Sequence, residues 1–412
     1  MKLEEKKLPN GWEVRKLGEV CDIVYGKGLP IKELKSSGYP VFGANGIIGF
    51  NDKFLFEEPQ VLISCRGAAS GKINLSPPKC YVTNNSLVLD IKKKDELDRN
   101  YLFFALNIAN KTKLVTGTAQ PQVTINNAVE LEIPLPPLPE QQKIVAKIEE
   151  LFSELENGKK ELLIAQAKLK TYRQSLLKWA FEGRLTNKNL KANELPKGWE
   201  VKRLGEVTSV LGDGLHGTPQ YCDQGEYYFI NGNNLTDGRI EIKENTKRVK
   251  FDEFKKYKKP LNEKTILVSI NGTLGYTAFY NDEKVMLGKS ACYFNVLDFV
   301  DKYYIRHFLT SNNFIKYANK NATGSTIKNV GLKTMRELQI AIPPLPEQQK
   351  IVAILESKLT ICDAIEETIK TSIKQGEALR QSILKKAFEG QLIVPKIQKS
   401  LESNYKNKES KK

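Results

Sequence analysis

Apolar residues recur at alternating steps of four and three along a long stretch near the middle of the chain. The positions of this pattern are Ile144, Ile148, Leu151, Leu155, Gly158, Leu162, Ala165, Leu169, Tyr172, Leu176 and Trp179. A step averaging 3.5 residues is the heptad pattern of a coiled coil, and Gly158 is its weak position. The pattern predicts a helix of roughly 45 residues, about 65 to 70 Å long at 1.5 Å per residue.

The same kind of stretch occurs again near the C-terminus, with a poorer apolar seam. The corresponding positions are Ile351, Leu355, Lys358, Cys362, Ile365, Ile369, Ser372, Gly376, Leu379, Ile383 and Lys386. Both stretches begin within one eleven-residue run, PPLPEQQKIVA, which occupies 136–146 and again 343–353. Proline suits the first turn of a helix, and glycine suits its C-terminal cap, which here falls at Gly183 and Gly390. The simplest arrangement is two antiparallel helices that cover each other's seams.

The chain therefore repeats one plan, because the start of each half is also duplicated. LPNGWEV at 8–14 returns as LPKGWEV at 195–201. Between these shared segments lie two dissimilar bodies, the second about twenty residues longer, which mix β-rich runs (61–67, 87–91, 266–272) with short helices (101–106, 303–309). The predicted division is two globular domains at 1–132 and 195–339, proline leaders with long helices at 133–185 and 340–392, a linker at 186–194 and a basic, disordered tail at 393–412.

Composition narrows the class of protein. The 412 residues include 40% hydrophobic and 27% charged residues, as in globular proteins, and no stretch approaches the roughly 20 apolar residues of a membrane span. Six scattered cysteines, without a CxxC pair or a nearby histidine, predict a reduced cytoplasmic protein without a metal site. A net charge of +16 favours an anionic partner, nucleic acid first.

The two long stretches also share residues that lie outside the apolar seam, which suggests a second kind of partner. A structural coiled coil explains the seam residues but not near-identity at positions beside them. We therefore predict two equivalent docking faces for two copies of one protein. The candidate residues are Glu140, Gln142, Lys143, Arg173 and Gln174, with Glu347, Gln349, Lys350, Arg380 and Gln381 in the second copy.

The ordered duplication resembles the DNA sequence-specificity subunit of type I restriction–modification systems. The LPxGWE-type starts, the YPVFGANGIIG stretch at 39–49, the Thr-Gly elements at 116–122 and 323–328, and PLPEQQKIVA before each long helix carry the resemblance. It implies an α+β fold in which two target-recognition domains are joined by two long antiparallel helices. Each domain would read one half of a split, asymmetric site in double-stranded DNA, and the helices would fix the gap. It also implies modification and restriction subunits as partners, which would hold S-adenosylmethionine, ATP and Mg, while this chain binds no cofactor.

Polar loop residues are the candidates for contact with DNA. Asn and Gln read adenine, Arg and Lys read guanine, and Ser, Thr and Lys hold phosphate. Singly, each such residue is more often an ordinary turn or cap, so the prediction concerns the loops. The candidates are Lys27, Asn45, Arg66, Lys72, Asn84, Gln120 and Gln122 in the first body, and His216, Thr218, Asn231, Asn233, Asn234, Asn271, Lys289 and Lys328 in the second. The segment 243–259 adds eight basic residues with interleaved aromatics, read as a solvated amphipathic helix or a stacking surface.

Enzyme motifs are incomplete in this sequence. Leu287-Gly288-Lys289-Ser290 ends like a phosphate-binding loop, but Glu283 occupies the position of its leading glycine. Asp237 with Glu241 and Lys243 only faintly matches a nuclease site, and two histidines offer no acid–base constellation. We predict no intrinsic catalysis. A nuclease or methyltransferase in its own right, and a coiled-coil adaptor with incidental charge, remain the alternatives.

Overall fold

The computed structural model describes residues 8–117, 120–187, 189–191, 194–324 and 326–393, so the predicted tail from 394 onward lies outside the described residues. The chain divides into two compact units, residues 1–162 with 371–412 and residues 163–370. Each unit contains one globular domain, together with part of each long helix. We call the globular parts domain 1 (residues 8–135) and domain 2 (residues 195–342).

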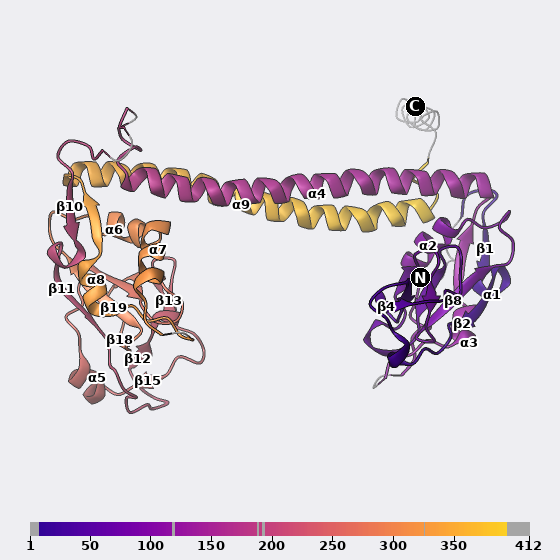
Figure 1. The fold of residues 1–412 in the computed structure, drawn as a ribbon, viewed down its shortest axis with the longest axis horizontal. Coiled ribbons are helices and arrows are strands. Elements are labelled where there is room, and N and C mark those ends of the chain that lie inside the picture. Colours follow the sequence, from indigo (N-terminus) through magenta and orange to yellow (C-terminus); the bar gives the residue numbers. More distant parts are fainter. Residues whose placement is uncertain (1–7, 118–119, 188, 192–193, 325, 394–412) are drawn as a thin grey trace, which may run out of the picture. The chain divides into compact units, whose positions relative to one another are not determined.

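Domain 1 is a mixed α+β body, as predicted (Figure 1). Its strands are β1 (Glu13–Lys16), β2 (Cys21–Tyr25), β3 (Tyr39–Phe42), β4 (Ile47–Asn51), β5 (Val61–Ser64), β6 (Ile73–Leu75), β7 (Tyr81–Val82), β8 (Ser86–Ile91) and β9 (Glu132–Leu135). Its helices are α1 (Leu17–Val20), α2 (Arg99–Ile108) and α3 (Ile125–Val129), with 3-10 turns η2 (Ile31–Glu33) and η3 (Gly67–Ala69).

Domain 2 follows the same order with additional elements. Its strands are β10 (Glu200–Arg203), β11 (Thr208–Asp213), β12 (Tyr227–Ile230), β13 (Leu235–Thr236), β14 (Arg239–Ile240), β15 (Arg248–Val249), β16 (Thr265–Ser269), β17 (Thr277–Phe279), β18 (Val285–Leu287), β19 (Ala291–Val296) and β20 (Gln339–Ile342). Its helices are α5 (Phe251–Tyr257), α6 (Lys302–Leu309), α7 (Asn312–Asn321) and α8 (Leu332–Glu337), with 3-10 turns η4 (Leu204–Glu206) and η5 (Gly232–Asn234).

Three sheets of domain 1 have counterparts in domain 2, which adds the pair β13-β14. Each domain has a four-stranded antiparallel sheet, β2-β8-β5-β6 or β11-β19-β16-β17, a three-stranded sheet, β4-β3-β7 or β15-β12-β18, and a two-stranded pair, β1-β9 or β10-β20. The central strands β5 and β16 are buried along their whole length, as their unbroken apolar runs require. The predicted strands at 61–67, 87–91 and 266–272 and the helices at 101–106 and 303–309 are confirmed. The start of the proline leader, for which a non-helical, extended backbone was predicted, forms strand, because Ile133–Leu135 pair with β1.

The two long helices, α4 (Leu138–Phe181) and α9 (Leu345–Phe388), have 44 residues each. In the first unit the start of α4 packs with the end of α9, since Ile144 and Ile148 share a core with Leu384. In the second unit the end of α4 packs with the start of α9, through Leu176 and Leu355. The predicted antiparallel pairing is therefore present in both units.

The predicted heptad seam is only partly correct in its second half, where Leu176 and Ile383 are buried as predicted but other seam positions are not. Tyr172 and Trp179 are 41% and 42% exposed, whereas Ala180 is fully buried. In α9, Leu379 is 50% exposed and Ala387 is buried where the pattern had placed Lys386. A straight α-helix with 3.6 residues per turn drifts about 20° per heptad from a 3.5-residue repeat. Over five heptads this amounts to about one residue, so the buried positions shift by one.

A buried glutamine at the start of each long helix fixes that helix to its domain. Gln141 is fully buried; its Nε2 donates to the carbonyls of Glu96 and Pro136, both at 2.8 Å, and its Oε1 accepts from the Asp98 amide at 2.9 Å. Gln348, also fully buried, repeats these bonds with the carbonyls of Phe299 and Pro343 and with the Asp301 amide. Asp98 and Asp301 cap α2 and α6. The identity of the PEQQ run is thus partly structural.

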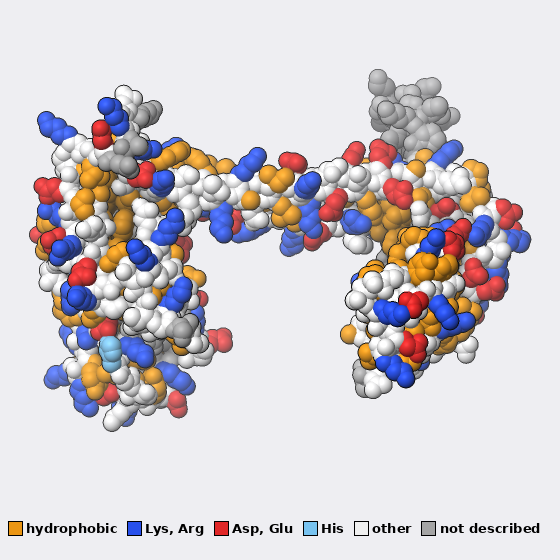
Figure 2. All heavy atoms as spheres, viewed as in Figure 1, with side chains coloured by type: hydrophobic (Ala, Val, Ile, Leu, Met, Phe, Trp, Pro, Cys, Tyr) orange, Lys and Arg blue, Asp and Glu red, His pale blue; other side chains and the backbone are white. Residues whose placement is uncertain are grey.

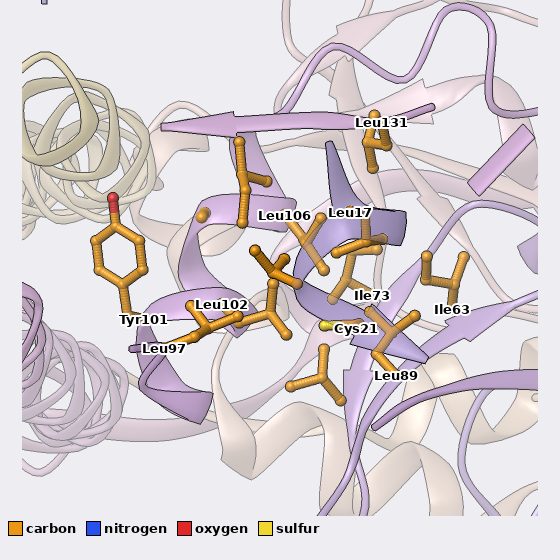
Figure 3. Packing of buried hydrophobic residues seen from close by; sticks show 14 of the residues in the cluster. Leu17, Cys21, Ile63, Ile73, Leu89, Leu97, Tyr101, Leu102, Leu106 and Leu131 are labelled. Atoms are coloured by element: carbon orange, nitrogen blue, oxygen red, sulfur yellow. The ribbon is translucent and has the colours of Figure 1, made fainter. Parts of the chain in front are cut away.

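The end of each long helix is held by an aromatic contact and a glycine turn. In the first unit the Phe388 ring lies 5.1 Å from that of Tyr101, which points away from the Leu-rich core in Figure 3. In the second unit Phe181 lies 5.2 Å from Tyr304. Gly183 and Gly390 have φ of +76° and +69°, and a Cβ on either would strike Pro196 or Pro9. The proline of each LPxGWE start therefore packs on a helix end.

Candidate nucleic-acid interface

The loop after the central strand of domain 1 presents Arg66 beside Gln122. The backbone of Arg66 forms an isolated antiparallel β-bridge with that of Gln122, and Gln122 forms a second such bridge with Thr116. The second bridge closes a tight loop at Gly117, whose φ is +84° and where a Cβ would lie 2.6 Å from the Gln120 carbonyl. The Thr-Gly element therefore places Gln122 next to Arg66, and both side chains are exposed.

Domain 2 has the same arrangement at the corresponding residues. Asn271 bridges Asn329, and Asn329 bridges Thr323, which precedes Gly324 at φ +89°. The Asn271 Nδ2 donates to the Asn329 Oδ1 at 3.2 Å. Asn329 was missed by the sequence reasoning, although it lies 207 residues after Gln122, the spacing of the PPLPEQQKIVA repeat.

Asn271 and Asn329 line a depression of about 320 Å³ together with Lys289, His216 and Asp213. The His216 ring Nε2 lies 2.5 Å from the Asp213 Oδ2, and the Asp213 side chain is 16% exposed. Gly214 explains the close approach of this loop, since a Cβ there would lie 2.1 Å from the Leu287 carbonyl. The predicted residues His216, Asn271 and Lys289 are thus brought together.

The other five candidates of domain 1 lie in loops near the one that carries Arg66. Lys27 bridges Thr83, the residue before Asn84, and the Asn84 carbonyl accepts from the Cys65 thiol at 3.5 Å. Asn45 lies in the turn between β3 and β4, whose Ala44 carbonyl accepts from Ser64. Lys72 and Gln120 are exposed in neighbouring turns.

The remaining candidates of domain 2 differ in accessibility. Asn234 is 5% exposed, and its Nδ2 donates to the Glu241 carbonyl at 3.0 Å, so the prediction of DNA contact by this side chain is wrong. The Asn231 Oδ1 accepts from Ser290 at 2.9 Å. Lys328 donates to Asn319, and its side chain is exposed. Thr218 and Asn233 are exposed.

The extra residues of domain 2 form a basic lobe, which we define as residues 231–264 between β12 and β16. Only Phe251–Tyr257 of the predicted amphipathic segment is helical. The rings of Tyr227 and Phe254 stack at 3.9 Å, and Phe251 is 50% exposed. The buried Glu253 accepts from the Gln220 amide at 3.0 Å, which fixes α5 to the loop that carries His216. Figure 2 shows Lys and Arg side chains over this part of domain 2.

Several predicted docking residues are used inside their own unit. Arg173 is only 21% exposed and pairs with Asp363 at 2.7 Å and Glu366 at 3.1 Å, so the prediction that it lies on a free face is wrong. The drift of the seam places it between the helices.

Glu347 is also not a free docking residue. It accepts from Trp199 at 3.0 Å and from Thr186 at 2.7 Å, because the second LPxGWE start folds against α9.

The other docking candidates remain accessible to different degrees. The Arg380 guanidinium lies 3.8 Å from the centre of the Phe152 ring, and the residue is exposed. The Gln174 Oε1 is buried without a hydrogen-bond partner among the described residues. Glu140 is half-buried, whereas exposed side chains belong to Gln142, Lys143, Gln349, Lys350 and Gln381.

The incomplete enzyme motifs do not form sites. Strand β18 ends at Leu287 and β19 begins at Ala291, so Lys289 lies in a turn between strands and not before a helix, where a phosphate-binding loop requires it. Asp237 pairs with Arg306 at 2.8 Å, and Lys243 donates to the Asn233 carbonyl. Within the described ranges, no three His, Cys, Asp or Glu side chains gather as metal ligands, and no helix is long and apolar enough to cross a membrane.

Comparisons with known proteins agree with this architecture. The family model described as "Type I restriction modification DNA specificity domain" matches residues 9–164 and 196–375. A type I restriction enzyme specificity subunit of Escherichia coli, EcoDI, is 23% identical over 94% of this chain and 90% of its own length. A putative specificity subunit of Haemophilus influenzae is 28% identical over 90% of this chain and 94% of its own length.

Solved structures share the fold. The HsdS subunit from Thermoanaerobacter tengcongensis has a TM-score of 0.61 at 22% identity, covering 95% of this chain and all of that one. A chain from a study of complex assembly and conformational transition of the type I R-M system has a TM-score of 0.70 at 23% identity, covering 94% of this chain and all of that one. Because the family model spans most of both halves, the chain belongs to the family of type I restriction–modification DNA specificity subunits.

Proposed function

We propose that this chain binds an asymmetric, split site in double-stranded DNA, with one half-site for each domain. As a member of its family it is the non-catalytic specificity subunit of a restriction–modification complex. The observation that carries the proposal is the matched pair of domains: the same strands support exposed loops at the same positions, but the side chains on those loops differ. Loops with different side chains on equivalent sheets imply two different half-sites.

Charge and loop chemistry support contact with DNA in both domains. The net charge of +16 favours binding to the phosphate backbone, which supplies most non-specific affinity. We propose base or phosphate contacts for the exposed or half-exposed candidates around the two bridges, namely Lys27, Asn84 and Gln120 in domain 1 and His216, Thr218 and Lys289 in domain 2. Asn45, Lys72, Asn233 and Lys328 lie in adjoining turns and would hold phosphate.

The long helices would set the distance between the half-sites and carry the partner subunits. Each has 44 residues, about 66 Å at 1.5 Å per residue. We propose that Gln142 and Lys143, with Gln349 and Lys350, dock two copies of a modification subunit. Restriction subunits would join the same complex, and S-adenosylmethionine, ATP and Mg would bind to the partners. The six free cysteines support work in a reducing cytoplasm.

A selection from random duplexes tests this proposal. The full chain, with its native modification subunit, is mixed with a library of randomised double-stranded DNA, and the bound fraction is sequenced. We expect two short, unlike blocks of preferred bases with an unselected gap of fixed length between them. A single continuous block, two identical inverted blocks or no enrichment would contradict the proposal.

A further inference from the structure

The bridge after the central strand occupies one equivalent position in the two domains, and this can be established from the backbone alone. In domain 1 the Val123 amide donates to the Cys65 carbonyl at 3.0 Å, and in domain 2 the Val330 amide donates to the Ile270 carbonyl at 2.8 Å. The next residues are Arg66 with Gln122, and Asn271 with Asn329. The two pairs are therefore alternative occupants of one place in the fold.

The side chains of each bridged pair point to the same face. Opposite residues of an antiparallel pair have Cβ atoms about 5 Å apart on one side of the ladder. In domain 2 this is visible as the amide–amide bond between Asn271 and Asn329. That bond leaves the Asn271 oxygen as an acceptor and the Asn329 amino group as a donor. An acceptor beside a donor complements the N6 and N7 edge of adenine.

In domain 1 the corresponding group is an unengaged guanidinium. Within the described part of the chain, Arg66 has no side-chain hydrogen bond or ion pair, whereas Arg15, Arg173 and Arg306 are each paired with a carboxylate. An exposed arginine fork beside a glutamine presents donors only at its tip, which complements the O6 and N7 acceptors of guanine.

The turn that follows Arg66 in domain 1 and Asn271 in domain 2 is open. Gly67 and Gly272 have φ of +76° and +75°, and a Cβ on either would meet nothing within 4 Å. The left-handed conformation favours glycine, and because glycine has no side chain, nothing projects from the tip of the loop at this position. Arg66 in domain 1 and Asn271 in domain 2 directly precede these open turns.

We propose that the pairs Arg66–Gln122 and Asn271–Asn329 are the positions that make the two half-sites different, with Arg66 reading guanine and the two asparagines reading adenine. The inference rests on the proposed function and assigns one base in each half-site. It also predicts that the identity of the base follows the pair, because the backbone beneath is the same.

The test compares single variants in the random-duplex selection described above, with the full chain and its native modification subunit. Arg66→Ala should lower the preference for guanine at one position of one half-site by about 5- to 150-fold, the range for a bidentate base contact. Asn271→Ala should do the same for one adenine in the other half-site. Arg66→Lys keeps the charge but loses the fork, so it should still reduce the guanine preference.

A matched control and a transplant sharpen the test. The control is Lys53→Ala, which removes an exposed cation. Lys53 follows β4, whose last residue, Asn51, pairs with Tyr39 at the end of β3 that is farther from the Asn45 turn. This variant should leave every base preference unchanged. The double variant Arg66→Asn with Gln122→Asn should shift the guanine position toward adenine.

If Arg66→Ala weakens binding equally to all sequences, Arg66 contacts only phosphate and the inference is overturned. If the unmodified chain selects no split site, the proposed function itself fails, so the two failures are distinguishable.

Discussion

The two domains share a frame but differ in charge beyond it. Between the equivalent strands β3 and β5, domain 1 has 18 residues with one basic and three acidic side chains. Between β12 and β16, domain 2 has 34 residues, the basic lobe, with ten basic and six acidic side chains. The central sheet and the bonds of the buried glutamine are alike in both units, whereas the loops around them differ. If specificity resides in the loops, as proposed, it can be changed without altering the shared frame.

Exchanging the whole of domain 2 should give the largest change in sequence preference. Replacing residues 195–339 with the matching body of another specificity subunit should abolish preference for one original half-site and keep the other. Specific binding is typically about 10³ to 10⁷ times tighter than non-specific binding, so if the two half-sites contribute equally, affinity for the original site should fall about 30- to 3,000-fold. Selection from random duplexes measures this. Altered preference in both half-sites would show that the domains are not modular.

The shared frame can be broken at the buried glutamine in either unit. Gln348→Leu would leave the Asp301 amide and two carbonyls without their partner in a buried place, and each such loss costs about 1 to 3 kcal/mol. Gln141→Leu should cost a similar amount, since its three bonds are the same. Chemical denaturation measures the free energy of unfolding. The exposed neighbours Gln142→Leu and Gln349→Leu are the controls and should change it little.

The comparison also shows what a sequence pattern can and cannot predict. The duplicated segments, the central strands and the antiparallel helices follow from local periodicity. The seam beyond Leu162 followed only in part: Leu176 is buried as predicted, but helical drift places Arg173 inside where the pattern placed Tyr172. Asn234 and Asn271 look equally polar in sequence, yet one is buried by the fold of the lobe and the other is held at an open turn. Contacts between residues distant in sequence decide such cases.

The basic lobe should make domain 2 contribute more phosphate attraction than domain 1. Changing Lys255, Lys256 and Lys258 to Gln removes three exposed charges from α5 and its end. If all three contact phosphates, the slope of log affinity against log salt should decrease by about 0.9 for each, and affinity at moderate salt should fall about 10- to 100-fold for every sequence. Fluorescence anisotropy across a salt series measures both. The control is Lys32, Lys53 and Lys113 to Gln in domain 1, which should change the slope less.

The smallest expected difference between the domains concerns acid. His307 on α6 is buried, its Nε2 has no hydrogen-bond partner among the described residues, and burial followed by the nearby Arg306 charge lowers its pKa to about 4. Below pH 6.5 the unfolded chain gains a proton that the folded chain resists, so stability should fall as pH decreases from about 6.5 to about 4. The loss should be about 1 to 2 kcal/mol between pH 7 and pH 5. Domain 1 carries Phe104 at the matching turn of α2, packed against Phe152 at 5.8 Å.

Thermal unfolding of the unmodified chain and of His307→Phe at pH 7 and pH 5 measures this difference. The variant should lose less stability on acidification than the unmodified chain, because its ring cannot take up a proton. Equal losses in both proteins would place the acid-sensitive group elsewhere. The comparison would then be repeated with Phe104→His in domain 1, which should introduce a smaller acid sensitivity into the first unit if burial is its cause, because Phe104 is only partly buried.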